Sequence, residues 1–198
     1  LKQKRIGIKQ NNVLQKELLQ KDNSNRDFSQ QIAEMIAEKG VTVARGRNKL
    51  PVDNIENLDI GIITFESGSK SLVEDDNTHY QPFIKRLSRE ANSVSSISIG
   101  ENNSISTLKE KLSSYDNIIV CTHNAVKNVN QVKIAEKLME DFSIIILAIR
   151  NPYDLRLLDE ISIFITTYDY SPFNLKAAAD IITGKLKSSG KLPIEIEK

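Results

Sequence analysis

From residue 58 onward, short apolar segments of strand length alternate regularly with amphipathic segments of helix length. The apolar segments are "LDIGIITF", "VSSISIG", "DNIIVCT", "SIIILAIR" and "ISIFITTY". The first of them, "LDIGIITF", is an apolar run without clean alternation, a pattern typical of a strand that is buried on both faces of a sheet. Strands that alternate with helices form a parallel sheet with helices packed on both faces. We therefore predict a three-layer α/β/α sandwich.

The order of these elements predicts a mostly parallel, flavodoxin-like sheet, and both ends of the chain lie outside the alternation. Residues 1–25 are rich in Lys, Gln and Asn and have too few apolar residues for a core, so we expect a connector. The domain itself spans 26–198 and begins with an amphipathic helix that ends near Gly40. At its end, "LPIEI" at 192–196 predicts an added C-terminal edge strand, where proline is tolerated because it need not donate to a ladder.

The charge balance and residue content exclude several classes of function. A net charge of +1 lacks the basic surplus of a nucleic-acid-binding surface. The longest apolar run, at 144–149, is too short to cross a bilayer, so we expect no membrane span in this chain. The single cysteine excludes an internal disulfide. The two histidines, His79 and His123, have no partner at ligand spacing, so we predict no metal site, and we expect no cofactor.

Ligands of open α/β sheets bind beyond the carboxyl ends of the strands, so the loops after the predicted strands are the candidate sites. The loop "FESGSKS" contains Ser67–Ser71, which could hold the phosphate of a flavin, although a polar turn fits its pattern better. The loop "CTHNA" places Cys121 and His123 on the same side of a strand end. A cysteine nucleophile with a histidine base is conceivable there, but a buried strand cysteine is the better interpretation.

The loop "IRNPYDL" at 149–155 carries the densest set of polar side chains. Arg150 offers a planar fork to a carboxylate or to a hydroxyl-rich partner, and Asn151 and Asp154 add donors and acceptors. The same residues also fit a turn in which Asp154 caps the short helix that follows. The two interpretations are compatible.

Four stretches of the chain have to be considered together: "VTVARGRNKLP", "IRNPYDL", "TYDYSP" and "ADIITGKLKSSGKLPIEI". Their order and spacing resemble those of the C-terminal domain of glycoside hydrolase family 3, most of all in the bacterial β-N-acetylhexosaminidase branch. The loop from Arg150 to Asp154, the strand end Thr167–Tyr168 and the tail "GKLP" match the family pattern. The chain departs from it at Gly46, where Asn is usual, and at the two serines before "GKLP", where Pro is common.

The resemblance implies an accessory domain rather than a complete enzyme. These enzymes are retaining glycosidases that use a carboxylate nucleophile. In the hexosaminidase branch the nucleophile and the acid/base pair belong to an N-terminal (β/α)8 barrel, and its motifs are absent from this sequence. We therefore expect residues 1–25 to connect to a barrel upstream of Leu1, and this chain alone to be inactive, with no catalytic residue. In the related glucosidase branch an acid/base glutamate comes from this second domain, which makes Glu101 the position to check.

The resemblance also implies a role for the strand-end loops, which would pack near the catalytic face of the barrel. The residues expected to contact the barrel or the outer end of the sugar are Arg150, Asn151, Tyr153, Asp154 and His123. The substrate of the whole enzyme would be a glycan with a terminal β-linked N-acetylglucosamine, such as a cell-wall muropeptide. A bacterial cytoplasmic enzyme and a secreted, cell-wall-associated one both fit. Two alternatives stay open, a free-standing flavodoxin-like ligand-binding module and a cysteine-dependent hydrolase.

Overall fold

The computed structural model describes residues 26–66, 77–100, 104–158 and 160–196. The chain divides into two compact units, Leu1–Ile36 and Ala37–Lys198. In the first unit, the described residues are helical, and the helix continues into the second unit as far as residue 40. The helix predicted to end near Gly40 is therefore confirmed. Its large apolar side chains within the first unit are exposed, and they are Phe28, Ile32, Met35 and Ile36.

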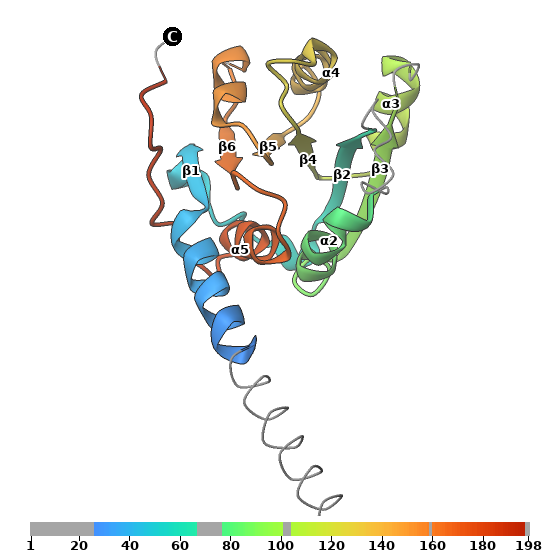
Figure 1. Ribbon diagram of the computed structural model, residues 1–198. Helices are drawn as coiled ribbons and strands as arrows, with labels where there is room; N and C mark the ends of the chain where they lie inside the picture. Colours follow the sequence, from blue (N-terminus) through green and yellow to red (C-terminus); the bar gives the residue numbers. More distant parts are fainter. Residues whose placement is uncertain (1–25, 67–76, 101–103, 159, 197–198) are drawn as a thin grey trace, which may run out of the picture. The chain divides into compact units, whose positions relative to one another are not determined.

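The second unit is built on a six-stranded sheet with the order β1-β6-β5-β4-β2-β3 (Figure 1). The strands are β1 (Thr42–Arg45), β2 (Asp59–Phe65), β3 (Ser93–Ile99), β4 (Asn117–Thr122), β5 (Ile144–Ala148) and β6 (Ile163–Thr166). All neighbouring pairs are parallel except β1 with β6. Counted from β2, the five parallel strands have the order 2-1-3-4-5, which is the flavodoxin-like arrangement. The predicted sheet is thus confirmed.

Helices cover both faces of this sheet, α2 and α5 on one face and α3 and α4 on the other (Figure 1). They are α2 (Gln81–Leu87), α3 (Ile105–Leu112), α4 (Val129–Met139) and α5 (Pro172–Ile182). Successive side chains of a strand point to opposite faces, so β4 and β5 contribute apolar residues to two separate cores, one under each helix pair. Every residue of β5 is buried, which explains why its sequence shows no alternation.

The edge strand predicted at 192–196 is wrong, because the described residues from 183 onward contain no strand. The sheet ends instead on β1, which runs antiparallel to β6. The C-terminal tail after α5 lies beside β1 (Figure 1), but it is bonded to β1 through the side chain of Ser188 and not through the backbone hydrogen bonds of a strand pair. The Val43 N–H donates to the Ser188 hydroxyl (3.3 Å), and this hydroxyl donates to the Val41 carbonyl (3.2 Å). These two backbone groups of β1 are bonded to a hydroxyl, and no further strand of the described residues pairs with β1 on this side.

The rest of the tail is held by Arg47 and by one close approach of the backbone. The Arg47 guanidinium donates to the carbonyl oxygens of Ser188 (2.6 Å) and Gly190 (2.9 Å). A Cβ atom at Gly190 would lie 2.4 Å from Thr42 Oγ1 and 2.7 Å from the Val41 carbonyl oxygen. The tail therefore passes β1 at a distance that only glycine allows, which is a physical reason for the glycine of "GKLP".

Candidate functional site

The parallel strands β2 to β6 end at one edge of the sheet, where the candidate loops lie. The loops after β4, β5 and β6, which are neighbours in the sheet, are described except for residue 159. The loops after β2 and β3 include 67–76 and 101–103. The phosphate loop considered at Ser67–Ser71 and the acid/base candidate Glu101 therefore lie outside the described residues.

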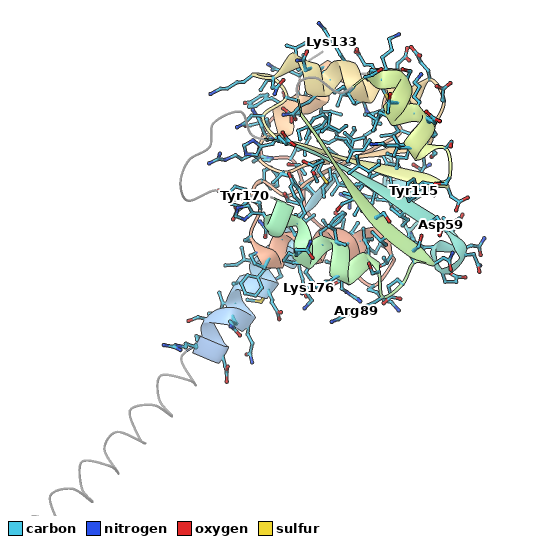
Figure 2. The ribbon with its side chains drawn as sticks, turned by 90° about the vertical axis from the view of Figure 1, so that its right-hand side faces the viewer. Asp59, Arg89, Tyr115, Lys133, Tyr170 and Lys176 are labelled. Carbon is cyan, nitrogen blue, oxygen red and sulfur yellow. The ribbon has the colours of Figure 1, made fainter. Side chains whose placement is uncertain are left out.

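Four side chains from four different segments contact one another at this edge. Arg150 Nη1 lies 3.5 Å from His123 Nε2. The Arg150 guanidinium carbon lies 5.8 Å from the centroid of the Tyr170 ring, and this ring lies 5.2 Å from the ring of His79, tilted by 52°. We call His79, His123, Arg150 and Tyr170 the Arg150 cluster. Figure 2 shows Tyr170 and Asp59, the first residue of β2, at opposite ends of the sheet, which places the cluster at the carboxyl edge.

Asp154 supports this edge from beneath, with no exposed surface. Its Oδ2 accepts a hydrogen bond from Thr122 Oγ1 (2.9 Å) and its Oδ1 accepts one from the Val126 N–H (3.2 Å). Burial raises the pKa of Asp154, because hydrogen bonds from Ala125, Thr122 and Val126 and the charge of His123 offset the loss of hydration only in part. Asp154 therefore joins the loop that carries His123 to the segment that follows Arg150.

A buried glutamine, Gln131 of α4, fixes the backbone of His123. Its Oε1 accepts from the His123 N–H (2.8 Å), and its Nε2 donates to the His123 carbonyl (3.2 Å). Both ends of the amide are thus used on one residue, which holds the start of the loop in place. Sequence reasoning missed Gln131, although a glutamine among the apolar positions of a helix was a usable signal.

The remaining two predicted residues of the loop, Asn151 and Tyr153, have different positions. Asn151 Oδ1 accepts from the Tyr153 N–H (3.0 Å) and so caps the short 3-10 helix η4 (Pro152–Leu157). The cap predicted at Asp154 is wrong, because η4 begins two residues earlier, at Pro152. Tyr153 is exposed, and the guanidinium of Arg156 lies 4.9 Å from its ring centroid.

The strand end Thr167–Tyr168 positions the loop that carries Tyr170. Thr167 Oγ1 donates to the Ile149 carbonyl (3.0 Å), next to Arg150. Tyr168 has a positive φ of 61°, and its hydroxyl donates to Thr42 Oγ1 (3.1 Å) in β1. These bonds explain structurally why a Thr-Tyr pair stands at this strand end. Sequence reasoning missed Tyr170 and His79 as neighbours of Arg150, although both lie at the sheet edge that it had singled out.

Cys121 is a core residue, as its preferred interpretation predicted. It is fully buried in β4, and burial raises the pKa of its thiol. A nucleophilic cysteine needs access and a stabilised thiolate, so the structure contradicts the cysteine-dependent hydrolase alternative.

We expect a thiol reagent to label Cys121 only in denaturant, because the folded protein exposes no part of this side chain. Mass spectrometry of protein treated with and without denaturant measures this. Labelling of the native protein at the rate of a free thiol would contradict the buried position.

Among the described residues, no three acidic, cysteine or histidine side chains come together in a way that could hold a metal ion. In the same part of the chain, no helix has the length and apolar character needed to span a membrane.

No protein-family model matches the sequence, and no curated protein matches it. Solved structures do match its fold. One is a fungal multi-domain GH3 β-N-acetylglucosaminidase described as having a GCN5-related glucosamine N-acetyltransferase region, with a TM-score of 0.71 and 22% identity. Another is a glycoside hydrolase family 3 β-N-acetylglucosaminidase from Paenibacillus sp. str. FPU-7, with a TM-score of 0.69 and 23% identity. A β-glucosidase from Listeria innocua in complex with isofagomine is more distant, with a TM-score of 0.60 and 11% identity.

The coverage of these matches is unequal. The matches with the two β-N-acetylglucosaminidases cover 82% of this chain but only 18% of the fungal protein and 32% of the Paenibacillus protein. The match with the β-glucosidase covers 80% of this chain and 26% of the β-glucosidase. This chain therefore spans less than a third of the length of these proteins. At such low sequence identities the comparison establishes the fold. It therefore confirms, for the fold, the resemblance that the sequence motifs indicated. The chain has the fold of one part of glycoside hydrolase family 3 enzymes.

Proposed function

We propose that this chain is the accessory C-terminal domain of a retaining glycoside hydrolase of family 3, of the β-N-acetylhexosaminidase branch. The observation that carries the proposal is the match with two β-N-acetylglucosaminidases over most of this chain but only a minor part of theirs. The motifs from Arg150 to Asp154 and in the tail support the same family. Catalysis would then reside in a (β/α)8 barrel of the same polypeptide, with residues 1–25 as the connector. The substrate would be a glycan with a terminal β-linked N-acetylglucosamine, such as a muropeptide.

The Arg150 cluster is the surface that we propose faces the barrel or the outer end of the sugar. It lies at the carboxyl edge of the parallel strands, where α/β sheets bind ligands. Arg150 and His79 are exposed, so their polar groups can reach a partner, and His123 and Tyr170 are half-buried beside them. Beneath them, Asp154 and the amide of Gln131 hold the loops. A firmly supported set of exposed polar groups favours recognition.

The helix at 26–40 supports a protein with further parts. Phe28 and Ile36 are 63% and 62% exposed, and Met35 is 48% exposed. Together with Ile32 these residues recur at the three- to four-residue spacing of one helix face. An exposed apolar face of this kind is normally covered in the assembled protein. We propose that the barrel in the same polypeptide covers this apolar helix face.

The test is hydrolysis of a chromogenic β-N-acetylglucosaminide by this chain and by the longer polypeptide that extends upstream of Leu1. We expect no hydrolysis by this chain, because the carboxylate pair and its orientation come from the barrel. The longer polypeptide should hydrolyse the substrate. A chromogenic β-glucoside is the matched control substrate, because a β-glucosidase also shares this fold.

The outcomes separate the parts of the proposal. Hydrolysis by this chain alone would overturn the accessory role, and Glu101 would be the first residue to replace. A longer polypeptide that cleaves only the β-glucoside would reject the hexosaminidase branch. Inactivity on both substrates would reject the hydrolase.

A further inference from the structure

The Arg150 cluster has the features of a binding site for one chemical group. We infer that Arg150 binds the carboxylate of an acidic sugar, while Tyr170 and His123 hold the guanidinium and His79 borders the site. That the ligand is a sugar rests on the proposed function, and that the group bound by Arg150 is a carboxylate rests on the structure. It names the class of glycan that the strand-end loops would recognise.

Arg150 presents an exposed guanidinium whose donors are largely unused. Within the described ranges of the chain, no carboxylate pairs with Arg150, and its one polar contact is the long one to His123 Nε2. Arg86 shows the contrast, because Asp180 and Glu90 both pair with it. The planar fork of arginine matches the two oxygens of a carboxylate, so Arg150 can bind one in a bidentate geometry.

The guanidinium is held in position before a ligand arrives. The centroid of the Tyr170 ring lies 5.8 Å from the guanidinium carbon of Arg150, and the His79 ring packs in turn against the Tyr170 ring. The guanidinium also contacts His123, and the Gln131 side-chain amide holds the backbone of His123 in place. Because these contacts restrict the Arg150 side chain in advance, a ligand loses less free energy in ordering it.

The charge of the cluster favours a carboxylate over a phosphate. Arg150 is the one arginine in the cluster, which contains no lysine, and its single permanent positive charge is balanced by a carboxylate monoanion. A phosphate dianion would carry one negative charge more than Arg150 can balance, and the described residues of the cluster include no second arginine or lysine. The imidazole of His79, which is exposed, can donate to or accept from a sugar hydroxyl group beside the carboxylate.

The experiment is a titration of this chain followed by NMR, with glucuronate and glucose as a matched pair that differs in the carboxylate. Inorganic phosphate is the third probe. We expect glucuronate to shift the resonances of Arg150, Tyr170, His123 and His79 as a group. Glucose should bind roughly ten- to a hundredfold more weakly, because it lacks the charge-assisted hydrogen bonds.

Variants locate the effect. Arg150→Gln should remove the preference for glucuronate, and Arg150→Lys should restore only part of it because lysine lacks the fork. Tyr170→Phe should retain binding and Tyr170→Leu should weaken it several-fold, since only the ring positions the guanidinium. The control is Arg89→Gln, an exposed arginine that lies after α2, near the amino ends of the strands (Figure 2). Since Arg150 is exposed, its variants should unfold at the wild-type temperature.

Several results would overturn the inference: equal binding of glucose and glucuronate, no binding of glucuronate, tighter binding of phosphate, or an equal loss of binding in Arg89→Gln. Binding is measured here without hydrolysis. If the longer polypeptide is inactive on both chromogenic substrates, the proposed function is rejected, but the binding of a carboxylate by Arg150 is still decided by the NMR titration. If glucuronate does not bind, the carboxylate site at Arg150 is rejected, but the proposed glycoside hydrolase activity is not.

Discussion

Replacement of Asp154 by alanine is expected to lower the free energy of unfolding by about 3 kcal/mol. The Asp154 carboxylate is fully buried and accepts hydrogen bonds from Thr122 Oγ1 and from the Val126 N–H. Alanine leaves the buried Thr122 hydroxyl and the partly buried Val126 N–H without their acceptor, and a buried unpaired group costs roughly 1–3 kcal/mol. Thermal or urea unfolding measures the change, which corresponds to a midpoint roughly 6–12 °C lower.

The matched control is Asp53→Ala, which removes an exposed carboxylate from the same domain. It should change the unfolding free energy by less than about 0.5 kcal/mol. Amide exchange at Val126 should accelerate in Asp154→Ala, since this N–H loses its partner. Equal stability of the two variants would show that Asp154 does not join the loops of the candidate site.

The raised pKa of Asp154 also predicts a pH dependence. Because the folded protein holds this proton more tightly than the unfolded chain does, the contribution of Asp154 to the unfolding free energy is largest below the ordinary aspartate pKa. It declines as pH rises through the raised pKa of the folded state. Asp154→Asn, which cannot ionise, should lose this decline, and a difference between the two pH profiles measures it. Parallel profiles would contradict the raised pKa.

Replacement of Gly46 by alanine is expected to cost about 3 kcal/mol as well. Gly46 has a φ of 77°, in the left-handed region, where a side chain costs roughly 1–2 kcal/mol. A Cβ atom here would also lie 2.1 Å from the Ser162 carbonyl oxygen, so the backbone just before β6 must move. Urea unfolding measures the loss, which would weaken the pairing of β1 with β6.

Gly40→Ala is the matched control for Gly46→Ala. Apart from its chain neighbours and its own helix backbone, no atom lies within 4 Å of a Cβ built at Gly40, and the φ of Gly40 is not positive. The substitution should be neutral or should stabilise the protein by less than about 1 kcal/mol. Similar losses in the two variants would contradict the close contact at Gly46. The same contact gives a physical reason for glycine where the family pattern has Asn, because a larger side chain would meet the Ser162 carbonyl.

The candidate site was predictable only in part. Arg150 was recognisable because arginine beside polar turn residues at a strand end offers an exposed fork. Its partners were not predictable, since Tyr170 and His79 are distant from Arg150 in the sequence and meet it only through side-chain packing between the segments at the strand ends. Asp154 looked like a surface residue in a polar loop. Its burial follows from the way η4 turns back over Thr122 and Val126, which no local pattern encodes.

The sequence by itself determined the layers and the order of the parallel sheet, because strand and helix periodicities are local and parallel strands need helical crossovers. Only the tertiary structure decided which segment closes the sheet. Both "VTVAR" and "LPIEI" had strand-like character, and periodicity cannot rank two segments for one edge. The choice rests on long-range contacts: β1 pairs with β6 through its backbone, while Ser188 and Arg47 hold the tail beside β1 through side chains. Such contacts join residues more than a hundred positions apart, so they exist only once the chain has folded.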